Sequence, residues 1–96
     1  MIFEWDPRKA VGNSKKHGVS FEEAATAFLD PEGLDGEDLA HSKGEARRLR
    51  LAKSGLGRVL LIAYTTRRTD DEEITRIISA RRASRKERKR YEVKED

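Results

Sequence analysis

The sequence predicts a small α+β domain in which two N-terminal helices cover one face of an antiparallel sheet and a third helix follows, in the order β-α-α-β-β-β-α. Three observations lead to this fold class. Two stretches near the N-terminus carry the start and stop signals of helices. Two stretches in the second half have the apolar or alternating pattern of strands. The remaining C-terminal stretch is polar and almost entirely cationic.

The composition limits the chain to one modest core. Only 35% of the 96 residues are apolar and 41% are charged, so a single domain over residues 1–96 is expected. The chain has no cysteine, which excludes disulfides and thiolate zinc sites. Its longest apolar run, residues 59–64, is far too short to span a membrane. The N-terminus lacks a secretory signal pattern, so the cytoplasm is the expected location.

The first predicted elements are a short strand and a helix. Residues 2–5 alternate in polarity as a strand does. Asp6 is a good N-cap, and Pro7 is tolerated in a first helical turn. Gly18 suits the left-handed position that ends a helix. His17, directly before it, lies where the helix dipole favours a protonated imidazole, so capping is its simplest role.

A second helix is predicted to begin at the capping box formed by Ser20 and Glu23. It ends before Pro31, because the residue preceding a proline resists the helical conformation. Neither of the two helices carries a basic recognition face, which argues against major-groove reading by this pair. The second helix is therefore expected to pack on the sheet through an apolar stripe, which comprises Phe21, Ala24, Ala25, Ala27, Phe28 and Leu29.

Residues 32–44 are polar and contain glycines, which predicts a loop with one short edge strand near Leu34. The loop contains three carboxylates, Asp35, Glu37 and Asp38. They lack the spacing and the closing glutamate of a calcium-binding EF-hand. His41 is expected to be exposed. No metal ion or other cofactor is therefore predicted.

From Glu45 the sequence takes on a period of two, which predicts strands. Residues 54–57 form a glycine-containing turn, and residues 59–66 are apolar on both faces, as expected for a central strand. A polar turn at residues 67–73 leads to another strand at residues 74–82. These strands form a meander with one face covered by the helices.

The last predicted helix begins at the capping box formed by Ser84 and Glu87. Tyr91 is its one large apolar side chain. Because a helix normally folds by burying an apolar stripe, its arginines and lysines indicate a polyanion or an acidic partner. The alternative is a solvated terminal helix without a partner.

The charge is divided unevenly along the chain. Residues 1–46 carry five Lys/Arg against ten Asp/Glu, a net charge of −5, whereas residues 47–96 carry sixteen against eight, a net charge of +8. A compact domain with this division can present a basic face. Phosphate backbones are common targets of such a face, and an acidic protein fits the same charge.

Cations on successive strands could converge at one end of the sheet beside an aromatic side chain of the last helix. These residues are Arg50, Lys53, Arg58, Arg81 with Arg82, and Tyr91. RNA cleavage by its own 2′-hydroxyl needs a base, a stabiliser of phosphorane charge and an acid. A lysine or tyrosine could move the protons, and tyrosine could also stack on a base. The alternative is that these cations are the solvated face of a sheet.

Several stretches resemble the BrnT family, which are toxins of type II toxin–antitoxin modules. They are Phe3-Glu4-Trp5-Asp6, Lys9, Asn13, residues 16–24, residues 76–83, Glu87-Arg88 and Tyr91. The resemblance implies a compact RelE-like fold and a ribonuclease activity that arrests translation. It also implies neutralisation by a BrnA-like antitoxin, whose DNA-binding region lets the complex repress its own operon.

The resemblance, with positional analogy to the wider RelE-like superfamily, implies a set of site residues. The implied catalytic residues are Lys53, Arg58, Arg81 and Tyr91. The implied RNA-binding residues are Arg50, Arg76, Arg82, Arg85, Lys16 and His17. The antitoxin would lay an acidic or amphipathic segment on the basic face, contact DNA itself, and join two toxin copies in a heterotetramer. The alternative function is a non-catalytic module that binds RNA or an acidic protein.

Overall fold

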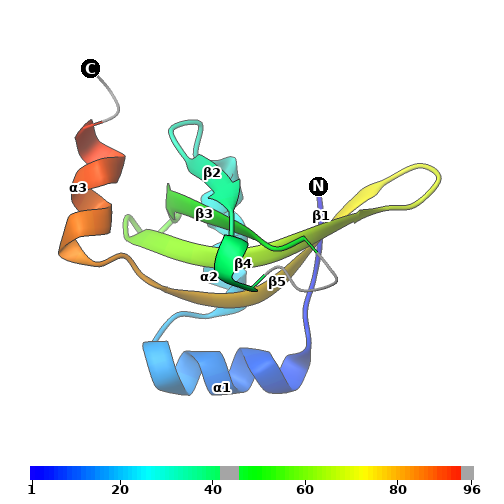
Figure 1. Cartoon of the computed structure of the whole chain (residues 1–96). Helices are drawn as coiled ribbons and strands as arrows, with labels where there is room; N and C mark the ends of the chain where they lie inside the picture. Colours follow the sequence, from blue (N-terminus) through cyan, green and yellow to red (C-terminus); the bar gives the residue numbers. More distant parts are fainter. Residues whose placement is uncertain (42–45, 94–96) are drawn as a thin grey trace.

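The computed structural model describes residues 1–41 and 46–93, which form one five-stranded sheet with three α-helices (Figure 1). The predicted α+β class and the C-terminal helix are confirmed. The strands lie in the order β1-β5-β4-β3-β2. Their bounds are β1 Ile2–Glu4, β2 Leu34–Glu37, β3 Arg48–Lys53, β4 Val59–Arg68 and β5 Glu73–Arg82. The α-helices are α1 Pro7–His17, α2 Phe21–Thr26 and α3 Arg85–Val93, and two short 3-10 helices are η1 Ala27–Leu29 and η2 Leu39–His41.

The sheet is mixed rather than antiparallel throughout. Strands β2 to β5 pair antiparallel as predicted, but β1 runs parallel to β5, with Ile2 opposite Ile74. The predicted edge strand near Leu34 is β2. The end of the predicted loop, at residues 42–44, and the predicted start of the next strand at Glu45 lie outside the described residues.

Three predicted helix boundaries are confirmed by their capping contacts, whereas the second helix is α-helical only to Thr26 and continues to Leu29 as the 3-10 helix η1. The Asp6 carboxylate accepts a hydrogen bond from the backbone N–H of Arg8 at 2.8 Å. Gly18 ends α1 in the left-handed conformation, with φ of 68°. Ser20 accepts a hydrogen bond from the backbone N–H of Glu23 at 3.0 Å, which begins α2.

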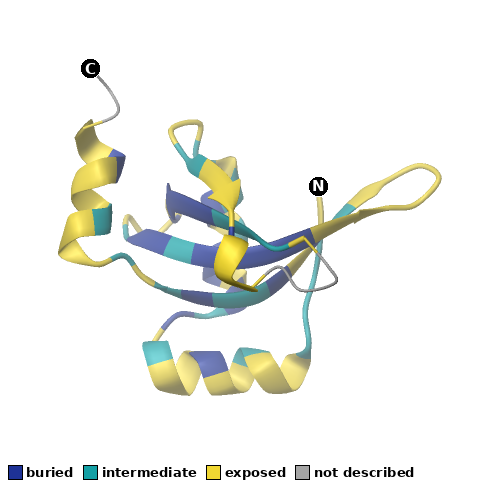
Figure 2. Cartoon of the chain, in the orientation of Figure 1, coloured by how far each residue is buried: buried dark blue, intermediate teal, exposed yellow. Residues whose placement is uncertain are grey.

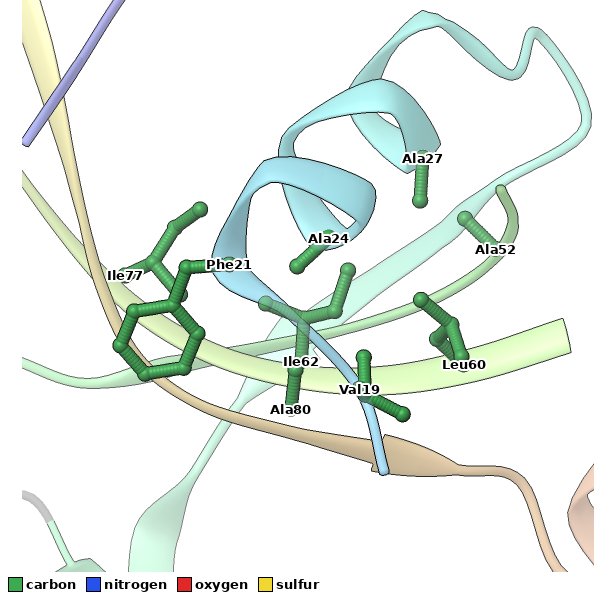
Figure 3. Packing of buried hydrophobic residues seen from close by; sticks show 9 residues of the cluster. All are labelled: Val19, Phe21, Ala24, Ala27, Ala52, Leu60, Ile62, Ile77 and Ala80. Carbon is green, nitrogen blue, oxygen red and sulfur yellow. The ribbon is translucent and has the colours of Figure 1, made fainter. Parts of the chain in front are cut away.

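The main core lies between α2 and one face of the sheet (Figure 3). Small side chains on α2 bring this helix close to the strands, whose central residues are mostly buried (Figure 2). The cluster comprises Val19, Phe21, Ala24 and Ala27 above the sheet, and Ala52, Leu60, Ile62, Ile77 and Ala80 within it. Nothing comparable to α2 covers the opposite face among the described residues, where α3 packs only at one end.

Helix α1 runs beside the outer edge of β5, beyond the point where β1 stops pairing (Figure 1). The buried Asn13 side chain donates to the Ala80 carbonyl at 2.8 Å and accepts from the Ala80 N–H at 3.1 Å. It also donates to the Val19 carbonyl at 2.9 Å. Asn13 thus takes the place of a further strand and satisfies backbone groups at an open sheet edge.

Replacing Asn13 with alanine is expected to lower the free energy of unfolding by about 2–4 kcal/mol, because buried backbone groups of Ala80 lose their partners. Urea unfolding followed by circular dichroism measures this. Lys9→Ala, on the exposed part of the same helix, is the control and should change stability by less than about 0.5 kcal/mol. Equal stabilities of the two variants would contradict the edge-capping role of Asn13.

Candidate active site

The face of the sheet opposite α2 carries an open cavity of about 470 Å³. Its floor comes from three neighbouring strands, with Leu49 on β3, Leu61 and Ala63 on β4, and Ser79 on β5. The register places Ala63 between Leu49 and Ser79, so these side chains share one face. The chain that follows β2 crosses in front of this face, whereas α2 lies behind the sheet (Figure 1).

His41 and Asp38 form one wall of the cavity. The His41 Nδ1 atom lies 3.1 Å and 3.2 Å from the two carboxylate oxygens of Asp38. The Asp38 side chain is only 10% exposed, whereas that of His41 is 65% exposed. The turn is fixed because the Asp38 N–H donates to the Arg47 carbonyl, and the His41 N–H donates to the Asp38 carbonyl. A buried carboxylate therefore holds one ring nitrogen and leaves the other, Nε2, on the accessible side.

This pair was missed by the sequence analysis, which treated His41 only as an exposed residue. His41 is exposed as predicted, but exposure alone gave no indication of a partner. The Asp-x-x-His spacing was the available signal, since residues three apart meet in a helical turn. Among the cavity residues, Arg47 was likewise not singled out.

His17 lines the same cavity from the opposite side. It is the last residue of α1, and the left-handed Gly18 turns the chain sharply after it. Because α1 lies along the outer edge of β5, its C-terminal end reaches the rim of the uncovered face. The implied RNA-binding role of His17 is compatible with this position.

Arg81 lies on the floor strand β5, opposite Leu61, and borders the cavity. Its Nη1 and Nη2 atoms donate to the two carboxylate oxygens of Glu87 at 2.8 Å and 2.9 Å. Glu87 in turn forms the predicted reciprocal capping box with Ser84 at the start of α3. Hydrogen bonds from Arg81 lower the pKa of Glu87 to about 2 against the effect of burial, and the Ser84 N–H adds to this.

The Arg81–Glu87 pair predicts a specific loss of stability in acid. Because the pKa of Glu87 falls from 4.5 to about 2 on folding, the unfolded chain takes up this proton first. The contribution is complete above about pH 4.5 and is lost as the pH falls through about 2. Between pH 5 and pH 2, the melting temperature of the wild type should fall further than that of Glu87→Gln. If the melting temperatures of the two proteins fell equally with pH, the Arg81–Glu87 pair would not contribute to stability.

Lys53 and Tyr91 meet near the end of β3, as predicted. The Lys53 Nζ atom lies 6.0 Å from the centroid of the Tyr91 ring. Tyr91 is only 5% exposed and packs against Leu51 and Val59, so the predicted stacking of its ring on an RNA base is wrong. Its hydroxyl donates to the Asp30 carboxylate at 2.6 Å, which ties α3 to the body of the protein.

Asp30 also accepts a hydrogen bond from the Lys53 N–H at 2.8 Å. Burial raises the pKa of the Asp30 carboxyl. The hydrogen bonds from Tyr91 and from the backbone of Lys53 and Glu32 together lower this pKa by more, so it lies below its usual value. Asp30 is therefore an ionised acceptor at neutral pH. The geometry gives Tyr91 a tethering role.

Arg58 does not join Lys53 and Arg81, so its predicted convergence with them is wrong. Its guanidinium pairs with the buried Glu23 carboxylate on the α2 side, through Nε at 2.9 Å and through Nη2. It also donates to the Gly18 carbonyl at 3.1 Å. The hydrogen bond from Arg58 is the main cause of the lowered pKa of Glu23. Arg58 thus connects the β3–β4 turn to α2.

Arg50 is also misplaced in the predicted cluster, because it is buried on the α2 side of the sheet. Its guanidinium donates to the carbonyls of Ala27 at 3.1 Å and Asp30 at 2.7 Å, and to the Asp35 carboxylate at 2.5 Å. A Cβ atom at Gly33 would overlap this guanidinium, so a larger residue there would displace Arg50 from its carbonyl partners. Arg50 therefore caps the end of the α2–η1 segment and is closed to RNA.

The remaining implied RNA-binding residues are dispersed. Arg76 pairs with Glu4 at 3.2 Å, about 17 Å along β5 from Arg81 at the usual rise of a strand. Arg82 is exposed on the α2 side, since it lies opposite Leu60. The last two are exposed on helices, Arg85 on α3 and Lys16 on α1.

The site therefore consists of a cavity with cations and imidazoles on its walls and a floor of Leu49, Leu61, Ala63 and Ser79. The sequence model of a family described as "Ribonuclease toxin, BrnT, of type II toxin-antitoxin system" matches residues 5–87. The chain belongs to this family. The resemblance to BrnT proteins noted in the sequence is therefore confirmed.

A solved BrnT structure shows the same fold. The crystal structure of the Brucella abortus ribonuclease toxin BrnT aligns with a TM-score of 0.62 at 18% sequence identity, over 88% of this chain and 100% of that chain. No curated protein sequence matches. In the described part of this BrnT-family chain, no helix has the length and apolar character needed to cross a membrane.

Proposed function

We propose that this BrnT-family chain is an endoribonuclease that cleaves RNA in the cavity of the uncovered face, by attack of the RNA 2′-hydroxyl and without a metal ion. The observation that carries the proposal is Arg81, which borders a cavity of about 470 Å³ together with Arg47 and two imidazoles. Arginines next to a phosphate stabilise the charge that develops on the phosphorane. Cleavage of cytoplasmic RNA would arrest translation.

In this proposal the predicted residues take different roles, according to where their side chains lie. Arg81 is retained as the phosphate-contacting residue, because 42% of its side chain remains exposed beside the cavity. Lys53 does not line the cavity but lies at the end of β3 beside Tyr91 of α3, and it is assigned to guiding the RNA strand. Arg50 and Arg58 are assigned to the fold, since their guanidinium groups are committed on the α2 side.

The same face suits a protein inhibitor. A second cavity of about 260 Å³ shares Leu49 and Leu61 with the first, and it continues toward Glu87 and Arg90 of α3. A BrnA-like antitoxin would place apolar anchors on the leucines of this groove and acidic side chains beside the arginines of the first cavity, and so exclude RNA. We assign operon autorepression to a complex of two toxins and two antitoxins in which the antitoxin contacts DNA. Growth arrest on induction, relieved by co-expressing the neighbouring gene, tests the pairing.

Cleavage in the presence of EDTA tests the activity. Purified protein should cut a labelled RNA under these conditions and leave 2′,3′-cyclic phosphate and 5′-hydroxyl ends, which mass spectrometry identifies. RNA with 2′-deoxyribose at the cleaved position is the control and should remain intact. Cleavage restored only by added Mg²⁺, or full binding without any product, would refute the proposal, and the second result would favour a non-catalytic module.

A further inference from the structure

The proposed reaction needs a group that removes the 2′-hydroxyl proton and one that protonates the leaving 5′-oxygen. The chain contains only two histidines, and both line the cavity. They reach it from different parts of the fold, His17 from the end of α1 and His41 from η2. This meeting of residues far apart in sequence indicates a shared role.

The contact between Asp38 and His41 has the form that orients a catalytic imidazole. A carboxylate at Nδ1 fixes the orientation of the ring and directs Nε2 outward. Asp38 is itself held in place, because its side chain is 10% exposed and its N–H donates to the Arg47 carbonyl. A surface pair made only for solubility would not need a buried partner.

The two histidines come from elements at opposite edges of the floor, since α1 contacts β5 and the Asp38–His41 turn is bonded to Arg47 beside β3. The three strands of the floor are about 10 Å across at the usual strand spacing. Leu61, in the middle of this floor, carries no polar side-chain atom and would leave the space above it for the substrate. Arg47 and Arg81 border the same space and carry the charge that a phosphate needs. The scissile phosphate can therefore lie between the two histidines.

We propose that His41 and His17 are the proton-transfer residues of RNA cleavage, and that Asp38 positions His41. This inference rests on the proposed function. Neutral His17 takes the proton from the 2′-hydroxyl as the 2′-oxygen forms its bond to phosphorus. The bond between phosphorus and the 5′-oxygen breaks, and His41 gives its proton to that oxygen. The products are a 2′,3′-cyclic phosphate and a 5′-hydroxyl, so no co-reactant is needed.

The assignment of the acid follows from the ion pair. His41 forms a charged pair with Asp38 only when its ring is protonated, which is the state that a proton donor requires. Among the residues that the structure describes, the other charged side chains that line the cavity are the arginines Arg47 and Arg81. They would hold the phosphate and would not compete for the leaving-group proton, since arginine stays protonated.

The assignment of His41 as the acid can be tested with an RNA whose leaving group needs no protonation. Two RNA oligonucleotides are compared in EDTA, one natural and one with sulfur in place of the bridging 5′-oxygen, because a thiolate leaves without protonation. His17→Asn and His41→Asn should each lower kcat on natural RNA by about 10²–10⁴-fold. On the sulfur-bridged RNA, His41→Asn should recover to within about tenfold of the wild type, whereas His17→Asn should remain slow.

The Asp38→Asn variant distinguishes a role of Asp38 in positioning His41 from a role in folding alone. It should lower kcat on natural RNA less than His41→Asn does, and the loss should disappear on the sulfur-bridged RNA. Lys15→Ala, on α1 but outside the cavity lining, is the matched control and should behave as the wild type. All variants are checked for unchanged circular dichroism.

Two outcomes overturn the inference. One is wild-type cleavage of natural RNA by His41→Asn or His17→Asn. The other is an equal loss on both substrates for folded His41→Asn. Failure of the wild type to cleave either RNA would instead count against the proposed function, so the two failures can be told apart.

Discussion

Cleavage by an Arg81→Ala variant is expected to fall by about 10²–10³-fold in kcat/KM, because the variant lacks the guanidinium that we propose stabilises charge on the phosphate. The fold should persist, since Arg81 is partly exposed and its ion pair is with Glu87 at the start of α3. Initial rates on a labelled RNA in EDTA give the effect.

Arg76→Ala is the matched control for this variant. Arg76 lies on the same strand, its side chain is 45% exposed against 42% for Arg81, and it too pairs with a glutamate. It differs in position, because it lies far from the cavity. Its kcat/KM should change little. Equal losses for the two variants would mean that general positive charge, and not the cavity, controls cleavage.

The second large effect is on folding. Glu23→Ala is expected to lower the free energy of unfolding by about 3 kcal/mol, because it removes the buried acceptor of Arg58 and Ser54. Arg58→Ala should also destabilise the protein clearly, since it leaves the Glu23 carboxylate buried without its cation. Urea unfolding measures both.

A double-mutant cycle identifies the pair as the cause. The combined Glu23→Ala and Arg58→Ala variant should cost less than the sum of the two single changes. Lys53→Ala, at the exposed end of β3, is the comparison and should leave stability nearly unchanged. If the Arg58→Ala variant were as stable as the wild type but inactive, the structural role of Arg58 would be contradicted and a role in the active site supported.

The local elements of this fold could be predicted because their signals are local. The capping boxes at Ser20 and Ser84, and Gly18 in its left-handed conformation, each set a helix boundary through contacts within a few residues. The apolar run on β4 likewise predicted a central strand. The parallel partner of β1 depends on packing between distant segments, and local signals do not contain it.

The direction of the arginines was the main error in predicting the site. Arg81 and Arg82 are adjacent in one strand, and Arg50 and Lys53 are three residues apart, so each pair must face opposite sides of the sheet. That parity was available from the sequence. Which side α2 would cover was not, because it depends on how the helix packs.

The most direct test of the central claim is where RNA binds. Amide chemical shifts of the labelled protein can be followed while an uncleavable RNA, with 2′-deoxyribose at the cleaved position, is added. We expect the largest shifts at His17, His41, Leu61 and Arg81, around the cavity. Shifts centred on α2 and the turn at Arg58, with the cavity residues unchanged, would contradict an active site on the uncovered face.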